Sequence, residues 1–351
     1  MRVSGCWTVD HRGYAPCPDP PREFRSLVSI HNHSCHSVEK LAKLNQVVKL
    51  TYMRPFSGIL QASFGLAAVE NLNYAEIHFN PPFTPEDVFD METAAVRRLG
   101  FERASVPVTD HDEVTAGIEL RRNRPADAAL TTLAEELTVR FQSHVFHLGV
   151  TGLPEKDIET THRDLQILSR GSRFDEMFDL LHATGCLVVL NHPFVAWKGG
   201  DAGIPVMDLL TRYGWAIDAL EFNGMRRREE NDRVLALAER VQKPVVAGGD
   251  SHLLVASSVF CGAREAATFQ EFIQEVKSGV GRPLVTNDYF APLNWKLLLR
   301  VLSFIGDYRR IGHFRGQPVK EMLRDRKVLL DPVGWTSRVF LRAVSRLGLA
   351  R

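Results

Sequence analysis

One unit recurs along most of this chain: an amphipathic helix, a glycine that ends it, a short apolar strand, and a polar side chain after the strand. The unit is first clear at Thr84-Pro85, where threonine is the expected N-cap and proline the first helical residue. Later copies lead into apolar runs at 187–190 and 245–247. Alternation of helix and strand predicts parallel strands joined by right-handed crossovers, which is an α/β architecture.

Histidine and carboxylate side chains follow the apolar runs of this repeat. A strand places residues i and i+2 on one face, so both members of an H-x-H or D-x-H pair can reach one ion. Imidazole and carboxylate are ligands of zinc, manganese and iron. In a closed β/α barrel such groups collect at the carboxyl ends of the strands. The sequence therefore predicts a metal centre built from such groups, among them His31, His33, His111, His147, His192, Asp250 and His252.

Composition narrows the class of protein. The chain has 351 residues, a net charge of +1, 44% hydrophobic and 24% charged residues, which is typical of a globular protein and not of a nucleic-acid binder. Five scattered cysteines predict no disulfide framework, and the first 30 residues contain no apolar signal segment. We therefore expect a reduced, cytoplasmic protein. No apolar run reaches the roughly 18 residues of a membrane span.

We expect three segments. Residues 1–26 are predicted to be an extended arm, 27–283 the metal-binding barrel, and 284–351 a basic, mainly helical extension. An insertion at 40–80 is predicted to be either a lid over the site or a packing flap. From residue 295 onward the extension has 13 Lys/Arg against 4 Asp/Glu. It is expected to pack on the barrel or on a second subunit, and its charge to be a solvated face or a contact for a polyanion, membrane surface or partner.

The ordered motifs H-N-H-S, T-D-H-D, a glutamate before H-L-G, N-H-P, E-F-N and G-G-D-S-H resemble those of the PHP (polymerase and histidinol phosphatase) superfamily over roughly 27–281. The resemblance implies a distorted seven-stranded β/α barrel and a metal-dependent phosphoesterase, usually with three metal ions. It implies that His31 and His33 bind the first ion and that Glu136 bridges two ions. It assigns the remaining ligand positions to His111, His147, His192, Asp250 and His252.

Some positions leave alternatives open. Glu135 competes with Glu136 as the bridging carboxylate, although the following Leu-Thr favours Glu136, and His144 competes with His147. Asp110 and Asp112 flank His111 and are predicted either to fix its tautomer or to serve as turn or cap residues.

The third metal site departs from the pattern of the family. Val38 stands where the resemblance expects an aspartate. Glu39 lies one residue later and His36 lies nearby, so we expect either of them to complete a weak third site. The alternative is a centre with two ions.

These inferences predict a metal-dependent hydrolase of phosphate esters that holds two or three Zn, Mn or Fe ions. The expected substrate is a small phosphomonoester or nucleotide, attacked by a metal-bound hydroxide held at Glu136 and Asp250. Arg226, Arg227 and Arg228 follow a strand and are candidates for binding substrate phosphate, the alternative being a solvated helix start. Alternative functions are an oligonucleotide-trimming exonuclease, a non-catalytic metal-binding scaffold, and a C–N hydrolase resembling amidohydrolases.

Overall fold

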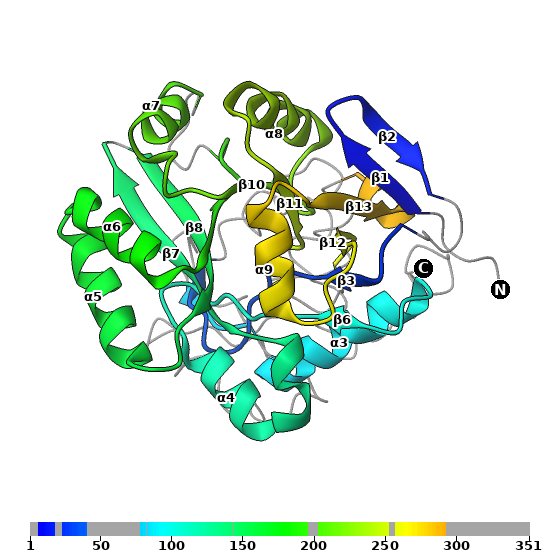
Figure 1. Ribbon diagram of the computed structural model, residues 1–351, viewed down its shortest axis with the longest axis horizontal. Coiled ribbons are helices and arrows are strands. Elements are labelled where there is room, and N and C mark those ends of the chain that lie inside the picture. Colours follow the sequence, from blue (N-terminus) through cyan, green and yellow to red (C-terminus); the bar gives the residue numbers. More distant parts are fainter. Residues whose placement is uncertain are drawn as a thin grey trace, which may run out of the picture. The chain divides into compact units, whose positions relative to one another are not determined.

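The computed structural model of the chain describes residues 6–17, 23–40, 78–81, 83–142, 144–195, 203–252 and 257–292 (Figure 1). Contacts between residues divide the chain into two units. The first unit comprises residues 1–36, 84–251 and 256–290, and the second comprises 37–83, 252–255 and 291–351. Of the predicted site residues, Glu39 and His252 belong to the second unit and all the others to the first.

Two sheets form the first unit. One has the strand order β2-β1-β13-β12-β3-β6 and the other the order β11-β10-β9-β8-β7. The first consists of β1 (Cys6–Asp10), β2 (Gly13–Pro16), β3 (Ser26–Val28), β6 (Ala104–Ser105), β12 (Val259–Ala263) and β13 (Arg282–Thr286). The second consists of β7 (Leu133–Phe141), β8 (His144–Leu153), β9 (Leu187–Asn191), β10 (Ala219–Asn223) and β11 (Val245–Gly248). The predicted α/β class is confirmed.

Strand direction departs from the prediction at β8. β3 and β6 are parallel, and so are β9, β10 and β11. In contrast, β8 runs antiparallel to both β7 and β9, because a tight turn at Gln142 joins β7 to β8 with no helix between them. The expectation that each strand follows a crossover helix is therefore wrong here.

Two isolated parallel bridges join the two sheets. Asn32 bridges to Ser251, and His111 bridges to Glu136. Beside the first bridge, the His33 amide donates a hydrogen bond to the Ser251 carbonyl at 3.0 Å. The regular ladders of the first unit form these two sheets, and the predicted seven-stranded barrel is not found among the described strands as one closed sheet.

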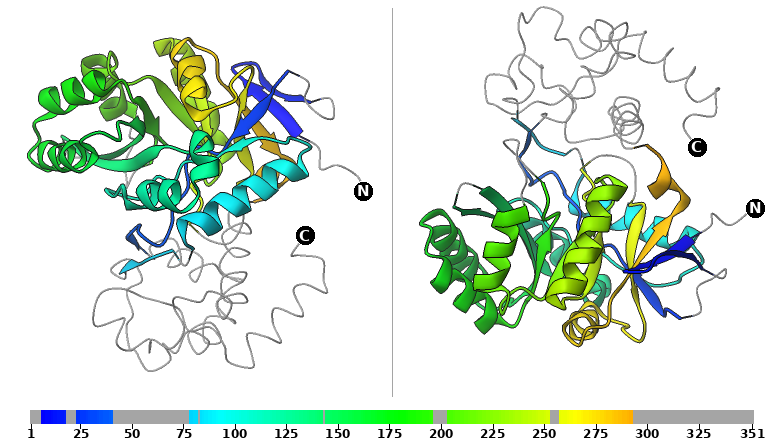
Figure 2. Two further views of the ribbon diagram at one scale, coloured as in Figure 1. Left: turned by 60° about the horizontal axis from the view of Figure 1, so that its bottom comes forward. Right: turned by 90° about the horizontal axis from the view of Figure 1, so that it is seen from above.

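Helices lie against the outer sides of these strands (Figures 1 and 2). The predicted helix start at Thr84 is confirmed: its hydroxyl accepts a hydrogen bond from the Asp87 amide at 3.1 Å, and the Asp87 carboxylate accepts one from the Thr84 amide at 3.0 Å. The helical elements are α3 (Pro85–Arg98), α4 (Thr115–Asn123), η1 (Pro125–Leu130), α5 (Ile158–Arg170), α6 (Phe174–Thr184), α7 (Gly203–Tyr213), α8 (Arg228–Val241), α9 (Phe269–Lys277) and η2 (Asn287–Phe290).

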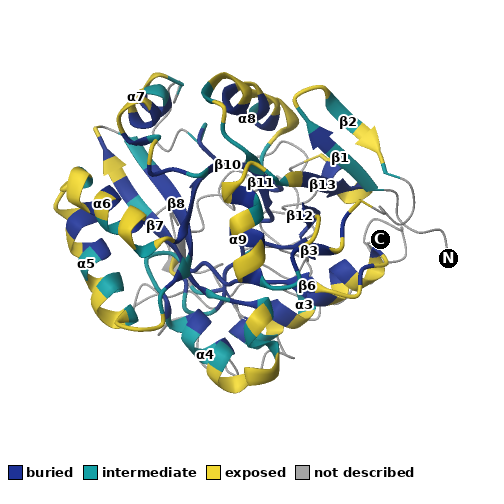
Figure 3. Cartoon of the chain, viewed as in Figure 1, coloured by how far each residue is buried: buried dark blue, intermediate teal, exposed yellow. Residues whose placement is uncertain are grey.

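The core lies between the strands and these helices. Figure 3 shows buried strands and helices whose outer faces are exposed. Leu137 on β7 and Leu190 on β9 have no exposed surface and pack with Phe178 of α6, whose ring stacks on Tyr213 with the centroids 4.4 Å apart. This apolar layer fixes the outward faces of the strands, so their alternate residues point to the opposite side.

The predicted N-terminal arm contains a β-hairpin, because β1 pairs with β2 and also with β13. In the second unit, β4 (Glu39–Lys40) and β5 (His78–Phe79) form an antiparallel pair. Helices predicted at 41–50, 295–305 and 336–347 lie outside the described residues. The segment boundaries at 26 and 283 stay predictions. None of the described helices is long and apolar enough to cross a membrane.

Candidate metal centre

Strand ends and strand interiors both supply the predicted ligands. His31 and His33 follow β3, and His111 follows β6. Glu136 and His147, by contrast, lie inside β7 and β8, so the prediction that the ligands follow strand ends is wrong for His147. Thr138 pairs directly with His147, and therefore Glu136, two residues before Thr138, points to the same face as His147. His192 follows β9 and Asp250 follows β11.

The Glu136 carboxylate lies at the middle of five imidazoles. It is fully buried, and both of its oxygens face ring nitrogens. Oε2 lies 3.1 Å from His31 Nε2, 3.4 Å from His33 Nε2 and 3.2 Å from His111 Nδ1. Oε1 lies 3.1 Å from both His147 Nδ1 and His192 Nε2. The structure therefore brings Glu136 together with these five predicted ligands.

Glu136 Oε2 has no hydrogen-bond partner in the part of the chain that the structure describes, although three ring nitrogens surround it. The Nε2 atoms of His31 and His33 also face each other at 3.0 Å. Buried polar atoms are rarely left unpaired, and lone pairs aimed at a common point are the arrangement that a cation needs. Three groups in the first unit can hold an ion: His31–Glu136–His192, His31–His33–Asp250 and His111–Glu136–His147. The donor set therefore fits a metal centre.

Asp250 faces the centre from the end of β11. Its Oδ1 lies 3.8 Å from His33 Nε2, and its Oδ2 accepts hydrogen bonds from Asn223 Nδ2 and from an Arg226 guanidinium nitrogen, both at 3.3 Å. The backbone of Asp250 has a φ of 49° and that of His192 a φ of 29°, a region that side chains other than glycine rarely adopt. Such strained conformations cluster at functional sites.

Glu221 of β10 fixes the orientation of His31, a role that the sequence analysis missed. Its Oε1 lies 2.6 Å from His31 Nδ1, and its Oε2 accepts a hydrogen bond from the His192 amide at 2.9 Å. A proton on Nδ1 leaves the lone pair of Nε2 free to face an ion. The signal in the sequence was the E-x-N pair at 221 and 223, whose side chains share one face of β10.

Close backbone approach explains the G-G pair before Asp250. A Cβ atom at Gly248 would lie 1.9 Å from Glu221 Oε1 and 2.6 Å from His31 Cβ. At Gly249 it would lie 1.7 Å from Ser257 Oγ. A side chain at Gly248 would displace the pair formed by Glu221 and His31, and one at Gly249 would displace Ser257, so the close packing here requires both glycines.

Burial and neighbouring charges shift the pKa values of three groups at this centre. Burial alone would raise the pKa of Glu136, but the surrounding histidines hold it well below its usual range. Burial would lower the pKa of His31, but Glu136 and Glu221 raise it well above its ordinary value. Burial and the charge of Arg226 lower the pKa of His192 to about 4. Protons and cations compete for such ligands, so metal binding here would release protons.

Three carboxylates near the candidate ligands have other hydrogen-bond partners among the described residues: Glu135, Asp110 and Asp112. Glu135 points to the other face of β7, where its Oε2 lies 3.1 Å from His162 Nδ1 of α5. Asp110 and Asp112 hydrogen-bond the backbone of neighbouring segments: Asp110 accepts from the Ser34 amide at 2.5 Å, and Asp112 accepts from the Thr138 amide at 2.7 Å. They tie the His111 segment to the strands on either side.

The contacts of His36 do not place it among the candidate ligands. His36 Nε2 lies 2.8 Å from Glu119 of α4, and no metal-compatible group among the described residues includes His36. Val38 is 51% exposed. Glu39 lies in β4, and its side chain is outside the described part of the structure. A third ion bound through His36 or Glu39 therefore stays a prediction.

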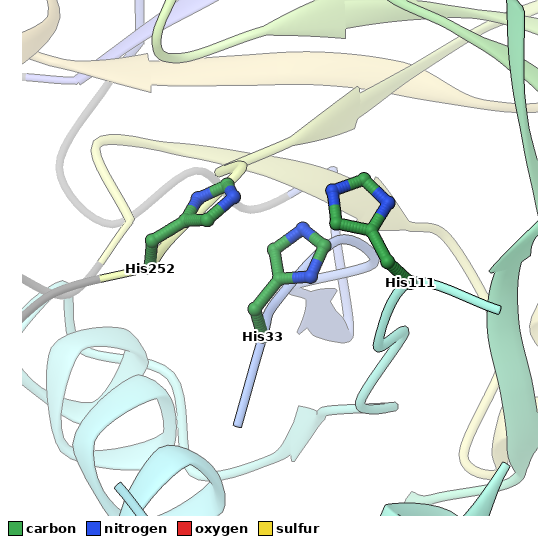
Figure 4. A group of neighbouring side chains, drawn as sticks. All are labelled: His33, His111 and His252. Carbon is green, nitrogen blue, oxygen red and sulfur yellow. The ribbon is translucent and has the colours of Figure 1, made fainter. Parts of the chain in front are cut away.

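Figure 4 shows His33 and His111, whose ring centroids lie 4.8 Å apart. His252, also drawn there, directly follows Ser251 and belongs to the second unit. Its role as a ligand stays a prediction.

One of the three candidate arginines reaches the centre. Arg226 is partly buried beside Asp250, whereas Arg227 and Arg228 are exposed at the start of α8. A small pocket adjoins the centre and is lined by His192, Phe194, Val195, Arg226, Glu230, Asn231 and Val234. Arg226 Nε is buried without a hydrogen-bond partner among the described residues. This pocket therefore offers a cationic group beside the candidate ligands.

No family model matches this chain, and no curated protein matches it. Among solved structures, it is similar to a protein from Bifidobacterium adolescentis assigned as a metal-dependent phosphoesterase, with 15% identity over 56% of this chain and 91% of that one, at a TM-score of 0.37. It is also similar to an amidohydrolase from Chromobacterium violaceum with bound sulfate and no metal (14% identity, 50% and 84% of the chains, TM-score 0.39). PsfC from Pseudomonas syringae has 14% identity over 62% and 86%, at a TM-score of 0.38.

Proposed function

We propose that this protein is a metal-dependent hydrolase of phosphate esters whose substrate is a small phosphomonoester or nucleotide. The observation that carries the proposal is Glu136 Oε2, a buried carboxylate oxygen without a hydrogen-bond partner in the described chain and 3.1–3.4 Å from three imidazole nitrogens. A hydrogen-bonded structural carboxylate would not need so many acceptor-capable rings around one atom. Two or more divalent ions are the occupants that this donor set suits best.

We also propose that seven strands, β3 and β6 to β11, form the distorted barrel that the PHP resemblance implies. The ladders run from β7 to β11 and from β3 to β6. The bridges Asn32–Ser251 and His111–Glu136 lie where β3 meets β11 and where β6 meets β7. The supporting point is that Asn32 of the first bridge lies between the candidate ligands His31 and His33, and that the second bridge is formed by His111 and Glu136 themselves.

The residues of the centre have different proposed roles. The ions would be held by His31, His33, His111, Glu136, His147, His192 and Asp250, with His252 as a further proposed ligand. Bound divalent ions would supply an acidified water and neutralise charge on a phosphoryl group. Glu221 keeps His31 in the tautomer that faces the centre.

Arg226 supports phosphate as the recognised group. Its Nη2 donates to Asp250, its buried Nε has no partner among the described residues, and Arg226 is one of the residues that line the pocket beside His192. A guanidinium with an unused donor binds phosphate oxygens well. Arg227 and Arg228, both exposed, fit the alternative of a solvated helix start.

The test is a hydrolysis assay on protein loaded with Mn²⁺, Zn²⁺ or Fe²⁺, using p-nitrophenyl phosphate, a nucleoside monophosphate, a short oligonucleotide and an amide. Turnover of the small phosphates that is lost in Glu136→Gln and kept in Glu135→Gln supports the proposal. Preference for the oligonucleotide would indicate an exonuclease, and amide cleavage a C–N hydrolase. Metal retention without turnover of any substrate would indicate a scaffold and overturn the proposal.

A further inference from the structure

A chain of hydrogen bonds leads away from Asp250 toward the N-terminal hairpin. Its first member is Asn223, the last residue of β10. Asn223 Nδ2 donates to Glu221 Oε2 at 2.9 Å and to Asp250 Oδ2 at 3.3 Å. One amide group therefore bonds both the carboxylate behind His31 and a candidate metal ligand, and its position sets the distance between them.

Asn231 of α8 holds Asn223 in that position. Its Oδ1 accepts from the Asn223 backbone amide, and its Nδ2 donates to the Asn223 carbonyl, both at 2.9 Å. The Asn231 side chain thus pairs with the end of β10 in the way that a neighbouring strand would. It is 1% exposed, and the same Nδ2 also donates to the Tyr289 hydroxyl at 2.9 Å.

Tyr289 continues the chain to the hairpin. It is 4% exposed, and its hydroxyl oxygen lies 3.3 Å from that of Tyr14 on β2. The Tyr14 hydroxyl also donates to Asp232 at 3.3 Å, and the Arg228 guanidinium lies over the Tyr14 ring at 4.5 Å. The hairpin formed by β1 and β2 is therefore connected to the candidate centre by side chains from β2, η2, α8 and β10.

We propose that Asn231 is a positioning residue for the metal centre, acting through Asn223 on Glu221 and Asp250, with Tyr289 fixing the amide of Asn231. The inference rests on the proposed metal centre. Asn231 touches neither a candidate ligand nor the pocket's phosphate-binding group through its hydrogen bonds, so its effect passes through the backbone of Asn223. Partners of metal ligands set both ligand orientation and metal affinity.

The test compares Co²⁺ binding and the Co²⁺ absorption spectrum in Asn231→Asp, Tyr289→Phe and Tyr213→Phe. Asn231→Asp keeps the size of the side chain and loses both amide donors. Tyr289→Phe removes only the hydroxyl that Asn231 bonds. Tyr213→Phe is the matched control, because Tyr213 is 2% exposed and its hydroxyl donates to Asp175 at 2.8 Å in a different part of the core.

We expect Asn231→Asp to weaken Co²⁺ binding by about 10- to 100-fold and to shift the spectrum. Tyr289→Phe should weaken binding several-fold, and Tyr213→Phe should leave affinity and spectrum unchanged while lowering the melting temperature. Wild-type affinity and spectrum in both Asn231→Asp and Tyr289→Phe would overturn the inference, and if Asn231→Asp does not fold, Tyr289→Phe decides alone.

The readout separates this inference from the proposed function. Changed Co²⁺ binding in a protein that hydrolyses no phosphoester would support the positioning role and reject the activity. Phosphoesterase activity in the wild-type protein, together with unaltered Co²⁺ binding in both variants, would support the activity and reject the positioning role. A wild-type protein that binds no Co²⁺ or other divalent ion would overturn both.

Discussion

Glu135 and Glu136 are neighbours on β7, are both fully buried, and point to opposite faces of one sheet. Each has one oxygen without a hydrogen-bond partner among the described residues. Around Glu136 lie five imidazoles, whereas among the described residues the Glu135 side chain lies 3.1 Å from the His162 ring and 3.0 Å from the Gln166 amide. Burial raises the pKa of Glu135, while histidines lower that of Glu136.

The comparison teaches that burial and an unpaired oxygen do not by themselves mark a metal site. Both glutamates have these two properties. What distinguishes Glu136 is that three ring nitrogens, from the segments that follow β3 and β6, converge on its unpaired oxygen. One half-buried histidine, as on the Glu135 face, makes an ordinary ion pair between a helix and a strand.

The largest expected effect is a difference in activity between variants of these two glutamates. Glu136→Gln should lower phosphatase activity by at least about 100-fold, more than the loss of an outer partner costs, because one bridging group serves several ligand sets. Glu135→Gln should retain activity within about tenfold, or 1.4 kcal/mol of barrier. Steady-state kinetics and elemental analysis of both variants measure this. Equal losses in the two variants would contradict the assignment of Glu136.

The next effect concerns the carboxylate behind His31. Glu221→Gln should weaken metal binding by about 10- to 100-fold, because the amide replaces a carboxylate that accepts from both His31 Nδ1 and the His192 amide, and one of these donors would then face an NH₂ group. The corresponding change on the other face, Gln166→Glu or Gln166→Leu, removes a partner of Glu135 and should leave metal affinity unchanged. Chelator competition gives both dissociation constants, and a matching decrease in the Gln166 variants would argue that the two faces are coupled.

A smaller effect is expected at Gly149, which pairs directly with Glu136. A Cβ there would lie 2.8 Å from Asn191 Oδ1, and Asn191 Nδ2 donates to Glu136 Oε1 at 3.0 Å. Gly149→Ala should therefore reduce metal affinity several-fold and stability by about 1–3 kcal/mol. Gly281→Ala, whose nearest neighbour would lie at 3.5 Å, is the control. A metal titration and urea unfolding of the two variants settle the point.

The smallest effect is a pH dependence on the Glu135 face. The side-chain hydrogen bond to Glu135 raises the pKa of His162 above 6.5. A raised folded-state pKa gives stability that is complete below the unfolded value and is lost as the pH rises through the folded value. His162→Gln should thus lower the free energy of unfolding more at pH 6 than at pH 9. Urea unfolding at both pH values tests this, and a loss independent of pH would show that His162 acts through packing alone.

Local patterns were sufficient for part of this centre. The residues after Glu136 favoured it over Glu135 through the family resemblance, and the cap at Thr84 was readable from four residues. The pairing of β1 with β13 was not readable, because it joins segments about 280 residues apart and has no local signal.

Other features depend on contacts that no local pattern encodes. Helix α5 brings His162 to Glu135, although His162 reads as a surface residue in the sequence. The choice of Arg226 among three adjacent arginines follows from where α8 begins relative to Asp250. Glu221 became assignable only when its distance to His31 was known. Strand pairing and helix placement, not residue type, decide these roles.

The candidate ligands lie at the two bridges that connect the sheets. Asn32 lies between His31 and His33, and the other bridge is formed by His111 and Glu136 themselves. A cation bound by these residues would link the two sheets, so metal binding would stabilise the bridges between them. Hydrogen exchange should report it. The amides of His33 and Glu136, which bond across the bridges at 3.0 Å, should exchange faster after chelation, while amides within β9 keep their protection.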